Sequence, residues 1–188
     1  MELVSEAIVF AVKAHDGMRR KKSDAPYILH PMEAAVIVGT MTEDQNLIAA
    51  AVLHDVVEDA DIPLKEIEEK FGARVRELVQ SETEDKRAEL PPAATWRIRK
   101  EESLAVLKNT EDTGVLMVWL GDKLANMRSF YRDWKIEGDA IWKRFNQKDP
   151  GEQAWYYRSI LKLTERLSDT SAWLEYKTLT ELVFGKGE

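Results

Sequence analysis

Apolar residues recur at helical spacing along almost the whole of this 188-residue chain. In segment 2–15 they stand three and four positions apart, which places Leu3, Ala7 and Ala11 on one face of a helix. The same spacing predicts helices over residues 31–39, 44–59, 63–70, 75–84, 94–108, 115–134, 151–167 and 170–183, and another between Gly138 and Pro150. The run VLMVWL at 115–120 could form a buried strand, but apolar residues continue beyond it at helical steps. We therefore predict an all-α fold.

The length of the chain suits one compact domain over residues 1–188, with residues 135–188 as a C-terminal helical extension. Hydrophobic residues make up 44% of it, enough to bury a sizeable core. We expect the run IAAAVL before His54 to be buried on most sides. We expect two further groups to pack inward: Trp96, Ile98, Leu104 and Leu107 of the helix 94–108, and the C-terminal aromatic residues Trp142, Phe145, Trp155, Tyr156 and Tyr157.

Cysteine is absent, which excludes a disulfide framework, a thiolate zinc site and a cysteine nucleophile. Any bound metal must therefore be held by histidine and carboxylate. The formal net charge of −7 argues against a nucleic-acid partner and means that a small anionic ligand needs a local basic patch. The run of basic residues at 19–22 can supply one. No apolar run approaches the length of a membrane span, so we expect a cytoplasmic protein without a membrane partner.

The candidate chemistry centres on His54 and Asp55, which follow the apolar run directly. Glu58 and Asp59 come one helical turn later and share the same two ridges of the helix. Carboxylates at this density repel one another unless a cation compensates. The alternative is that the two acids form the solvated end of the helix and that His54 is a structural imidazole.

A second group lies far away in the sequence. Asp122 follows a strongly apolar run, Asn126 comes one turn later, and His30 stands in the segment YILHP. With His54 and Asp55 they give two imidazoles and two carboxylates, a donor set that suits a divalent ion such as Mn²⁺. A helix-capping role for Asp122 and a structural role for His30 remain open at this point.

Four segments together resemble a known family: AHDGMRRK, APYILHP, AAAVLHDVVEDADIPLKEIEEKFGARVRELV and GDKLANMR. The chain is similar to the HD-domain metal-dependent phosphohydrolases, and more narrowly to the alarmone hydrolase domain of RelA/SpoT-type enzymes and to small alarmone hydrolases. The resemblance implies Mn²⁺ ligands at His30, His54, Asp55 and Asp122, and a water-activating pair at Glu58 and Asp59. It implies substrate contacts at Arg20, Lys21, Lys86, Asn126 and Ser129.

Several positions depart from the family pattern. The basic loop leaves room for a register shift from Arg20–Lys21 to Arg19–Arg20, and Gly121 stands where the family has alanine. His15 is expected to be a structural, hydrogen-bonding residue near the metal and not a ligand.

The resemblance implies hydrolysis of the 3′-pyrophosphate of guanosine tetra- and pentaphosphate to GDP or GTP and pyrophosphate. Two alternatives stay open. One is an HD phosphohydrolase that acts on another nucleotide, such as an adenosine alarmone, NADPH or a nucleoside monophosphate. The other is a non-catalytic regulator that binds alarmones.

Overall fold

The computed structural model describes residues 1–20, 24–87 and 89–186. Apart from one β-bridge between Arg19 and Pro26, the regular structure in these ranges is helical, which confirms the predicted all-α fold. The α-helices are α1 Leu3–Ala14, α2 Leu29–Gly39, α3 Gln45–Leu53, α4 Val56–Asp59, α5 Leu64–Phe71, α6 Ala73–Glu82, α7 Pro92–Asn109, α8 Thr113–Glu137, α9 Pro150–Leu163 and α10 Ser171–Phe184. The described residues also form the 3₁₀ helices η1 Gly138–Arg144 and η2 Glu165–Leu167.

Side-chain caps set the start of several helices. Asp44, Asp112 and Asp149 each accept a hydrogen bond from the backbone N–H two residues later, and Thr170 caps α10 by accepting from the N–H of Trp173, three residues later. These contacts satisfy backbone donors that have no partner within the first turn. The cap of Asp112 matters most for function, because it begins the long helix α8.

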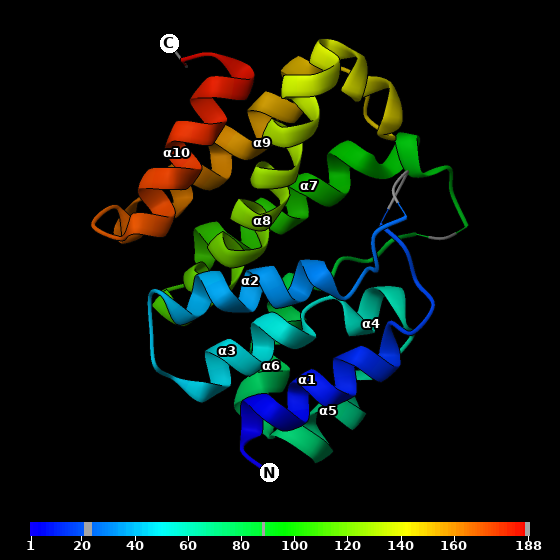
Figure 1. Ribbon diagram of the computed structural model, residues 1–188, viewed down its shortest axis with the longest axis vertical. Coiled ribbons are helices and arrows are strands. Elements are labelled where there is room, and N and C mark those ends of the chain that lie inside the picture. The colour runs from blue at the N-terminus through cyan, green and yellow to red at the C-terminus, as the bar shows by residue number, and fades with distance from the viewer. Residues whose placement is uncertain (21–23, 88, 187–188) are drawn as a thin grey trace.

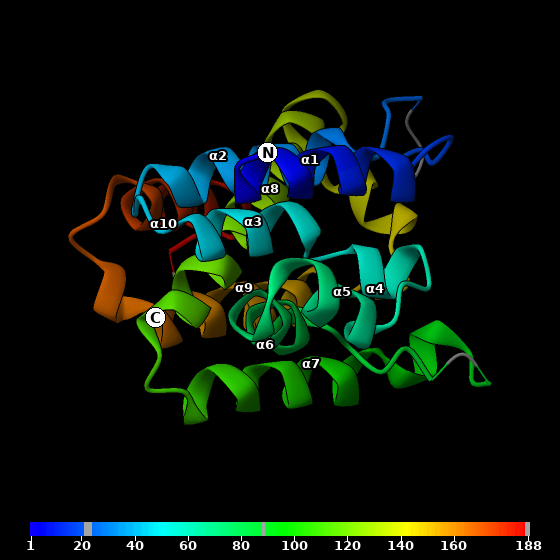
Figure 2. The same cartoon turned by 90° about the horizontal axis from the view of Figure 1, so that it is seen from below.

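Helix α8 is the centre of the packing (Figure 1), since α2, α3, α6 and α10 all lie against it. Seen from below, α1 and α2 form one side of the molecule and α7 the opposite side, with α3 and α6 between them (Figure 2). The run from Ala49 to Leu53 is wholly buried in α3, as predicted. Trp142, Tyr156 and Tyr157 are also buried and join the same hydrophobic core.

Three predictions about the elements were wrong. The segment 44–59 is not one helix, because it breaks at His54 and Asp55. The segment after Gly138 forms only a 3₁₀ helix, and the predicted helix 151–167 ends at Leu163. Within α7, Trp96 and Leu107 are buried, but Ile98 is 49% exposed and does not face the core. Among the described residues, no helix combines the length and apolar character that crossing a membrane requires.

The approach of α2 to α8 depends on Gly121, the residue before Asp122. A Cβ atom here would stand 2.7 Å from Cγ2 of Val38 and 3.0 Å from the carbonyl oxygen of Ala34. We therefore expect Gly121→Ala to destabilise the protein by about 1–3 kcal/mol, since α2 and α8 must separate to admit the methyl group. Chemical denaturation measures this change. Gly39→Ala is the control, because its nearest neighbour would be 4.0 Å away; equal stability of G121A and wild type would contradict the prediction.

Candidate metal centre

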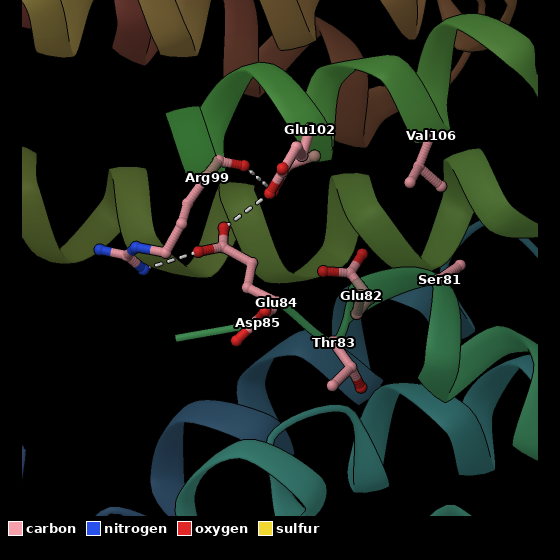
Figure 3. A pocket seen from close by; sticks show the side chains of 9 residues that line it. Ser81, Glu82, Thr83, Glu84, Asp85, Arg99, Glu102 and Val106 are labelled. Atoms are coloured by element: carbon pink, nitrogen blue, oxygen red, sulfur yellow. Dashed lines mark hydrogen bonds and ion pairs between the residues drawn. The ribbon is translucent and has the colours of Figure 1, made fainter. Parts of the chain in front are cut away.

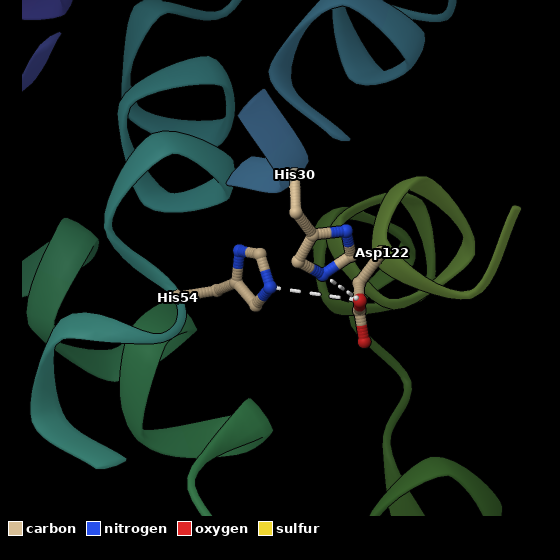
Figure 4. A group of neighbouring side chains, drawn as sticks. All are labelled: His30, His54 and Asp122. Carbon is tan, nitrogen blue, oxygen red and sulfur yellow. Dashed lines mark ion pairs between the residues drawn. The ribbon is translucent and has the colours of Figure 1, made fainter. Parts of the chain in front are cut away.

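Four side chains from three parts of the fold converge on one small volume. His30 lies in the first turn of α2, His54 follows α3, and Asp122 lies in the middle of α8 (Figure 4). Asp55 is the residue directly after His54. Nε2 of His30 is 2.9 Å from Oδ1 of Asp122 and 3.6 Å from Oδ2 of Asp55. Nε2 of His54 is 3.1 Å from the same Asp55 oxygen and 3.6 Å from the same Asp122 oxygen. Ligands about 2.1 Å from one ion adopt separations of this order.

The donor set fits a divalent cation. Ligand atoms of His30, His54 and Asp122 all lie within 4.8 Å of one another, and all three residues are buried. Nε2 of His54 is buried and makes no well-aligned hydrogen bond in the described part of the chain, although Oδ2 of Asp55 lies 3.1 Å away. An ion bound between the imidazole and the carboxylates would give this nitrogen a well-aligned partner.

Outer contacts hold three of these side chains in position. Nδ1 of His54 lies 2.8 Å from the carbonyl oxygen of Ala51, which directs Nε2 toward the cluster. Asp122 Oδ1 accepts a hydrogen bond of 2.8 Å from Asn126, and its Oδ2 is paired with Lys123. The carboxylate of Asp55 accepts a hydrogen bond of 2.7 Å from the hydroxyl of Tyr27.

The contact between His54 and Ala51 lies at the break in the predicted helix. In a continuous helix the Ala51 carbonyl would accept the N–H of Asp55. The His54 imidazole contacts that carbonyl at the place where α3 ends at Leu53 and α4 has yet to begin at Val56. The chain can therefore present His54 and Asp55 as neighbours facing the same point.

The electrostatics of the cluster favour a positive charge at its centre. Burial lowers the pKa of His54, but the carboxylates of Asp55 and Asp122 outweigh it and raise that pKa well above its usual range. Burial raises the pKa of Asp122, but Lys123 and the two imidazoles bring it well below its usual range. Because a ligating imidazole must be deprotonated, a metal ion and this proton compete for the same imidazole nitrogen, and the carboxylates favour either positive charge.

Glu58 and Asp59 lie in α4, beside the cluster and tied to the segment after α6. Oε1 of Glu58 accepts a hydrogen bond of 2.6 Å from the backbone N–H of Glu84. Lys86 Nζ contacts Oδ1 of Asp59 and the backbone carbonyl of Glu58, both at 2.6 Å. Burial raises the pKa of Glu58, opposed by the hydrogen bond from Glu84. The structure thus brings Lys86 to the acidic pair, where it neutralises part of their charge.

Glu84 is half-buried and connects Glu58 with α7, a role that was not predicted from the sequence. Its carboxylate accepts a hydrogen bond of 2.9 Å from Arg99 (Figure 3). It also accepts hydrogen bonds from Lys100 at 2.6 Å and from Ser103 at 2.9 Å, and all three donors lie on α7. Through its backbone N–H the same residue holds Glu58. Helix α7 therefore helps to fix the position of Glu58 through Glu84. The sequence between α4 and α7 contains no recognisable motif that would have signalled this role.

Of the predicted substrate residues, Arg20 and Asn126 lie at the centre. The guanidinium of Arg20 donates to Oδ1 of Asn126 at 3.1 Å, whereas that of Arg19 turns to the carbonyl of Asp24. Arg20, and not Arg19, is therefore the arginine of the basic loop that reaches Asn126. Lys21 lies outside the described residues. Ser129 accepts a hydrogen bond from Arg132, and no contact in the described ranges joins it to the four clustered residues.

A cavity of about 260 Å³ opens beside Asn126, between α7, α8 and α9. Its walls include Lys100, Lys123 and Arg144, and the rings of Phe145 and Tyr156. Each of these cations is also paired with a carboxylate outside the lining, Lys100 with Glu84 for example. The cavity therefore has both cationic and aromatic walls, and Asn126, which is hydrogen-bonded to Asp122, is part of its lining.

His15 and Tyr27 complete the surroundings, and they correct one expectation. His15 is buried near the cluster, as predicted, but its ring nitrogens have no hydrogen-bond partner in the described structure. Its imidazole instead packs on Tyr27, with ring centroids 5.0 Å apart. The role of Tyr27 was missed, although its place in the segment YILHP, three residues before His30, was a usable signal.

A buried carboxyl below the site gives a pH-dependent prediction. Glu82 is 6% exposed, and burial raises its pKa to about 8, opposed by Lys123. Because the folded protein holds this proton more tightly than the unfolded chain, Glu82 makes stability fall as pH rises from about 4.5 toward 8. The free energy of unfolding of Glu82→Gln, relative to that of wild type, is therefore expected to increase by up to about 2 kcal/mol from pH 6 to pH 8. Metal-free denaturation at both pH values tests this, and a difference independent of pH would contradict it.

Comparison with known proteins identifies the class to which this arrangement belongs. The HD domain family matches residues 7–150, which is more than half of the chain. The chain therefore belongs to the HD-domain family, whose members hold a divalent metal between histidine and aspartate side chains.

The curated relatives are more specific. GTP pyrophosphokinase rsh of Brucella ovis is 36% identical over 127 residues, which is 68% of this chain and 17% of that protein. Guanosine-3′,5′-bis(diphosphate) 3′-pyrophosphohydrolase of Aquifex aeolicus is 33% identical over 130 residues, 69% of this chain and 18% of that protein. The chain thus spans less than a fifth of the length of these relatives.

Among solved structures, a metazoan ortholog of SpoT, described as hydrolysing ppGpp, superimposes with a TM-score of 0.75. The match covers 99% of this chain and 98% of that one at 22% sequence identity, and it shows a shared fold.

Proposed function

We propose that this chain hydrolyses the 3′-pyrophosphate of guanosine 3′,5′-bis(diphosphate) and its pentaphosphate counterpart, giving GDP or GTP and pyrophosphate. The observation that carries the proposal is the convergence of His30, His54, Asp55 and Asp122, with Arg20 hydrogen-bonded to Asn126 beside them. The names of the relatives support the same reaction, although this chain matches only a small part of each.

The four clustered side chains would hold a divalent ion, for which we propose Mn²⁺. When bound, such an ion supplies positive charge to a phosphoryl group and makes water a stronger acid. Two nitrogen and two oxygen donors suit a borderline or hard ion and leave positions open for other ligands.

Glu58 is proposed as the base that takes a proton from the attacking water. The N–H of Glu84 occupies Oε1, so we assign the proton to Oε2, which lies 3.6 Å from Nζ of Lys86. Burial raises the pKa of this carboxyl, which makes it a better proton acceptor than an exposed glutamate. Asp59, held by Lys86, would help to orient the water.

Arg20 and Asn126 are proposed to position the nucleoside. The guanidinium carbon of Arg20 lies 5.5 Å from the ring centroid of Tyr27, and a guanidinium at this position can stack on a purine. Asn126 joins Arg20 to the proposed ligand Asp122, so an amide at this position can contact the ribose while the 3′-pyrophosphate lies at the cluster. Lys21 and Ser129 are kept as further proposed substrate contacts.

The test is product identification. The protein is stripped of metal with a chelator and incubated with guanosine 3′,5′-bis(diphosphate), with and without added Mn²⁺, Mg²⁺ or Zn²⁺. We expect GDP and pyrophosphate in equal amounts, and only in samples with metal. The proposed reaction would be contradicted if orthophosphate appeared without pyrophosphate. It would also be contradicted if an adenosine alarmone or NADPH were hydrolysed faster in a parallel assay, and the substrate would then be another nucleotide. Stoichiometric nucleotide binding without turnover would favour a regulator.

A further inference from the structure

Of the four clustered residues, Asp55 has the weakest support from the body of the fold. Its side chain is 18% exposed, against 5% for His30 and 6% for Asp122. It follows the helix break after α3 and lies at the N-terminus of the four-residue helix α4. A carboxylate in such a position can adopt several rotamers, so a further contact must select the one that faces the histidines.

Tyr27 provides that contact. Its hydroxyl donates a 2.7 Å hydrogen bond to Oδ2 of Asp55, the same oxygen that faces both imidazoles. Burial and the nearby carboxylates of Asp55 and Asp59 raise the pKa of the phenol, so it stays protonated and remains a donor. A carboxylate oxygen has two lone pairs, and the hydroxyl occupies one while the other remains free for an ion.

The ring of Tyr27 has separate contacts of its own. It packs against the imidazole of His15 at 5.0 Å and edge-on against His30 at 6.1 Å, between ring centroids. On the side of the basic loop, the guanidinium of Arg20 lies 5.5 Å from its centroid. Its backbone N–H bonds to the carbonyl of Met18 at 3.0 Å, which closes the loop that carries Arg20. One side chain therefore contacts both the clustered residues and the proposed substrate loop.

We infer that Tyr27 is a positioning residue with two separable functions: its hydroxyl orients Asp55 for the metal, and its ring supports Arg20 for the nucleotide. The inference rests on the proposed function of the cluster. It predicts that removing the hydroxyl weakens metal binding without affecting nucleotide binding. Removing the ring should weaken the binding of both.

The hydroxyl is tested with Tyr27→Phe, which keeps every ring contact. Calorimetric titration of the metal-free protein with Mn²⁺ should show a Kd raised by about 10- to 100-fold, the usual effect of losing an outer partner of a metal ligand. Saturating Mn²⁺ should restore kcat, and KM for the nucleotide should stay within about twofold of wild type. Tyr131→Phe is the matched control, since Tyr131 is half-buried and contacts only Lys135 among the described aromatic and cationic pairs.

The ring is tested with Tyr27→Leu, for which KM at saturating Mn²⁺ should rise at least about tenfold, with circular dichroism reporting the fold. The inference is overturned if Y27F binds Mn²⁺ as tightly as wild type, or if Y27L and Y27F have the same KM. A purely structural role would lower the melting temperature of both variants without separating Kd from KM. If wild type itself binds no Mn²⁺, the proposed function fails, which is a different result.

Discussion

Replacing Asp122 with asparagine is expected to abolish stoichiometric metal binding and to reduce turnover of guanosine 3′,5′-bis(diphosphate) to background. The substitution keeps the size of the side chain but removes the negative charge that both imidazoles and Lys123 face. A buried site that loses a charged partner leaves the others uncompensated, which costs about 3–5 kcal/mol in comparable buried pairs. Metal analysis of the purified protein and calorimetric titration with Mn²⁺ measure the first effect, and product chromatography the second.

The control for this prediction is Asp169→Asn, because Asp169 is exposed and lies in the turn before α10. It should bind metal and turn over as wild type does. The melting temperature adds an independent readout: Mn²⁺ should raise it in wild type and D169N but not in D122N, since only a protein that binds the ion is stabilised by it. Full metal occupancy in D122N would exclude Asp122 from the ligand set.

The second large effect is expected for Glu58→Gln, with the opposite pattern. Glutamine can still accept the N–H of Glu84 through its carbonyl oxygen, so the backbone of α4 and the four clustered residues should stay in place. It cannot take a proton from water at neutral pH. Turnover should fall by about 10²–10⁴-fold, the usual contribution of a positioned base, while Mn²⁺ affinity changes little.

Glu69→Gln provides the comparison, because Glu69 is an exposed residue of α5 paired only with Lys65 among the described ion pairs. It should leave both Kd and kcat unchanged. Loss of metal together with activity in E58Q would place Glu58 in the ligand set, and unchanged turnover would remove it from the proposed mechanism. The two variants E58Q and D122N therefore separate chemistry from metal binding.

Much of the fold could be predicted because helical periodicity is a local property. The starts of α3, α8 and α9 coincide with capping aspartates, and the buried run before His54 is visible as uninterrupted apolar sequence. The break at His54 could not be predicted, since neither glycine nor proline marks it and the contact of the His54 imidazole with the carbonyl of Ala51 is visible only in the structure. Ile98 was placed inward by its apolar character alone, whereas its exposure follows from the way α7 packs on its neighbours.

The candidate site divides in the same manner. The sequence by itself determined the residue types at positions 30, 54, 55 and 122 and their membership of a family motif. Only the tertiary structure decided that Arg20 and not Arg19 turns to Asn126, that Lys86 is paired with Asp59, and that Tyr27 and Glu84 support the centre. The physical reason is range: a helix forms from contacts within a few residues, but these pairs lie up to 106 positions apart and meet only when α2, α3, α7 and α8 pack together.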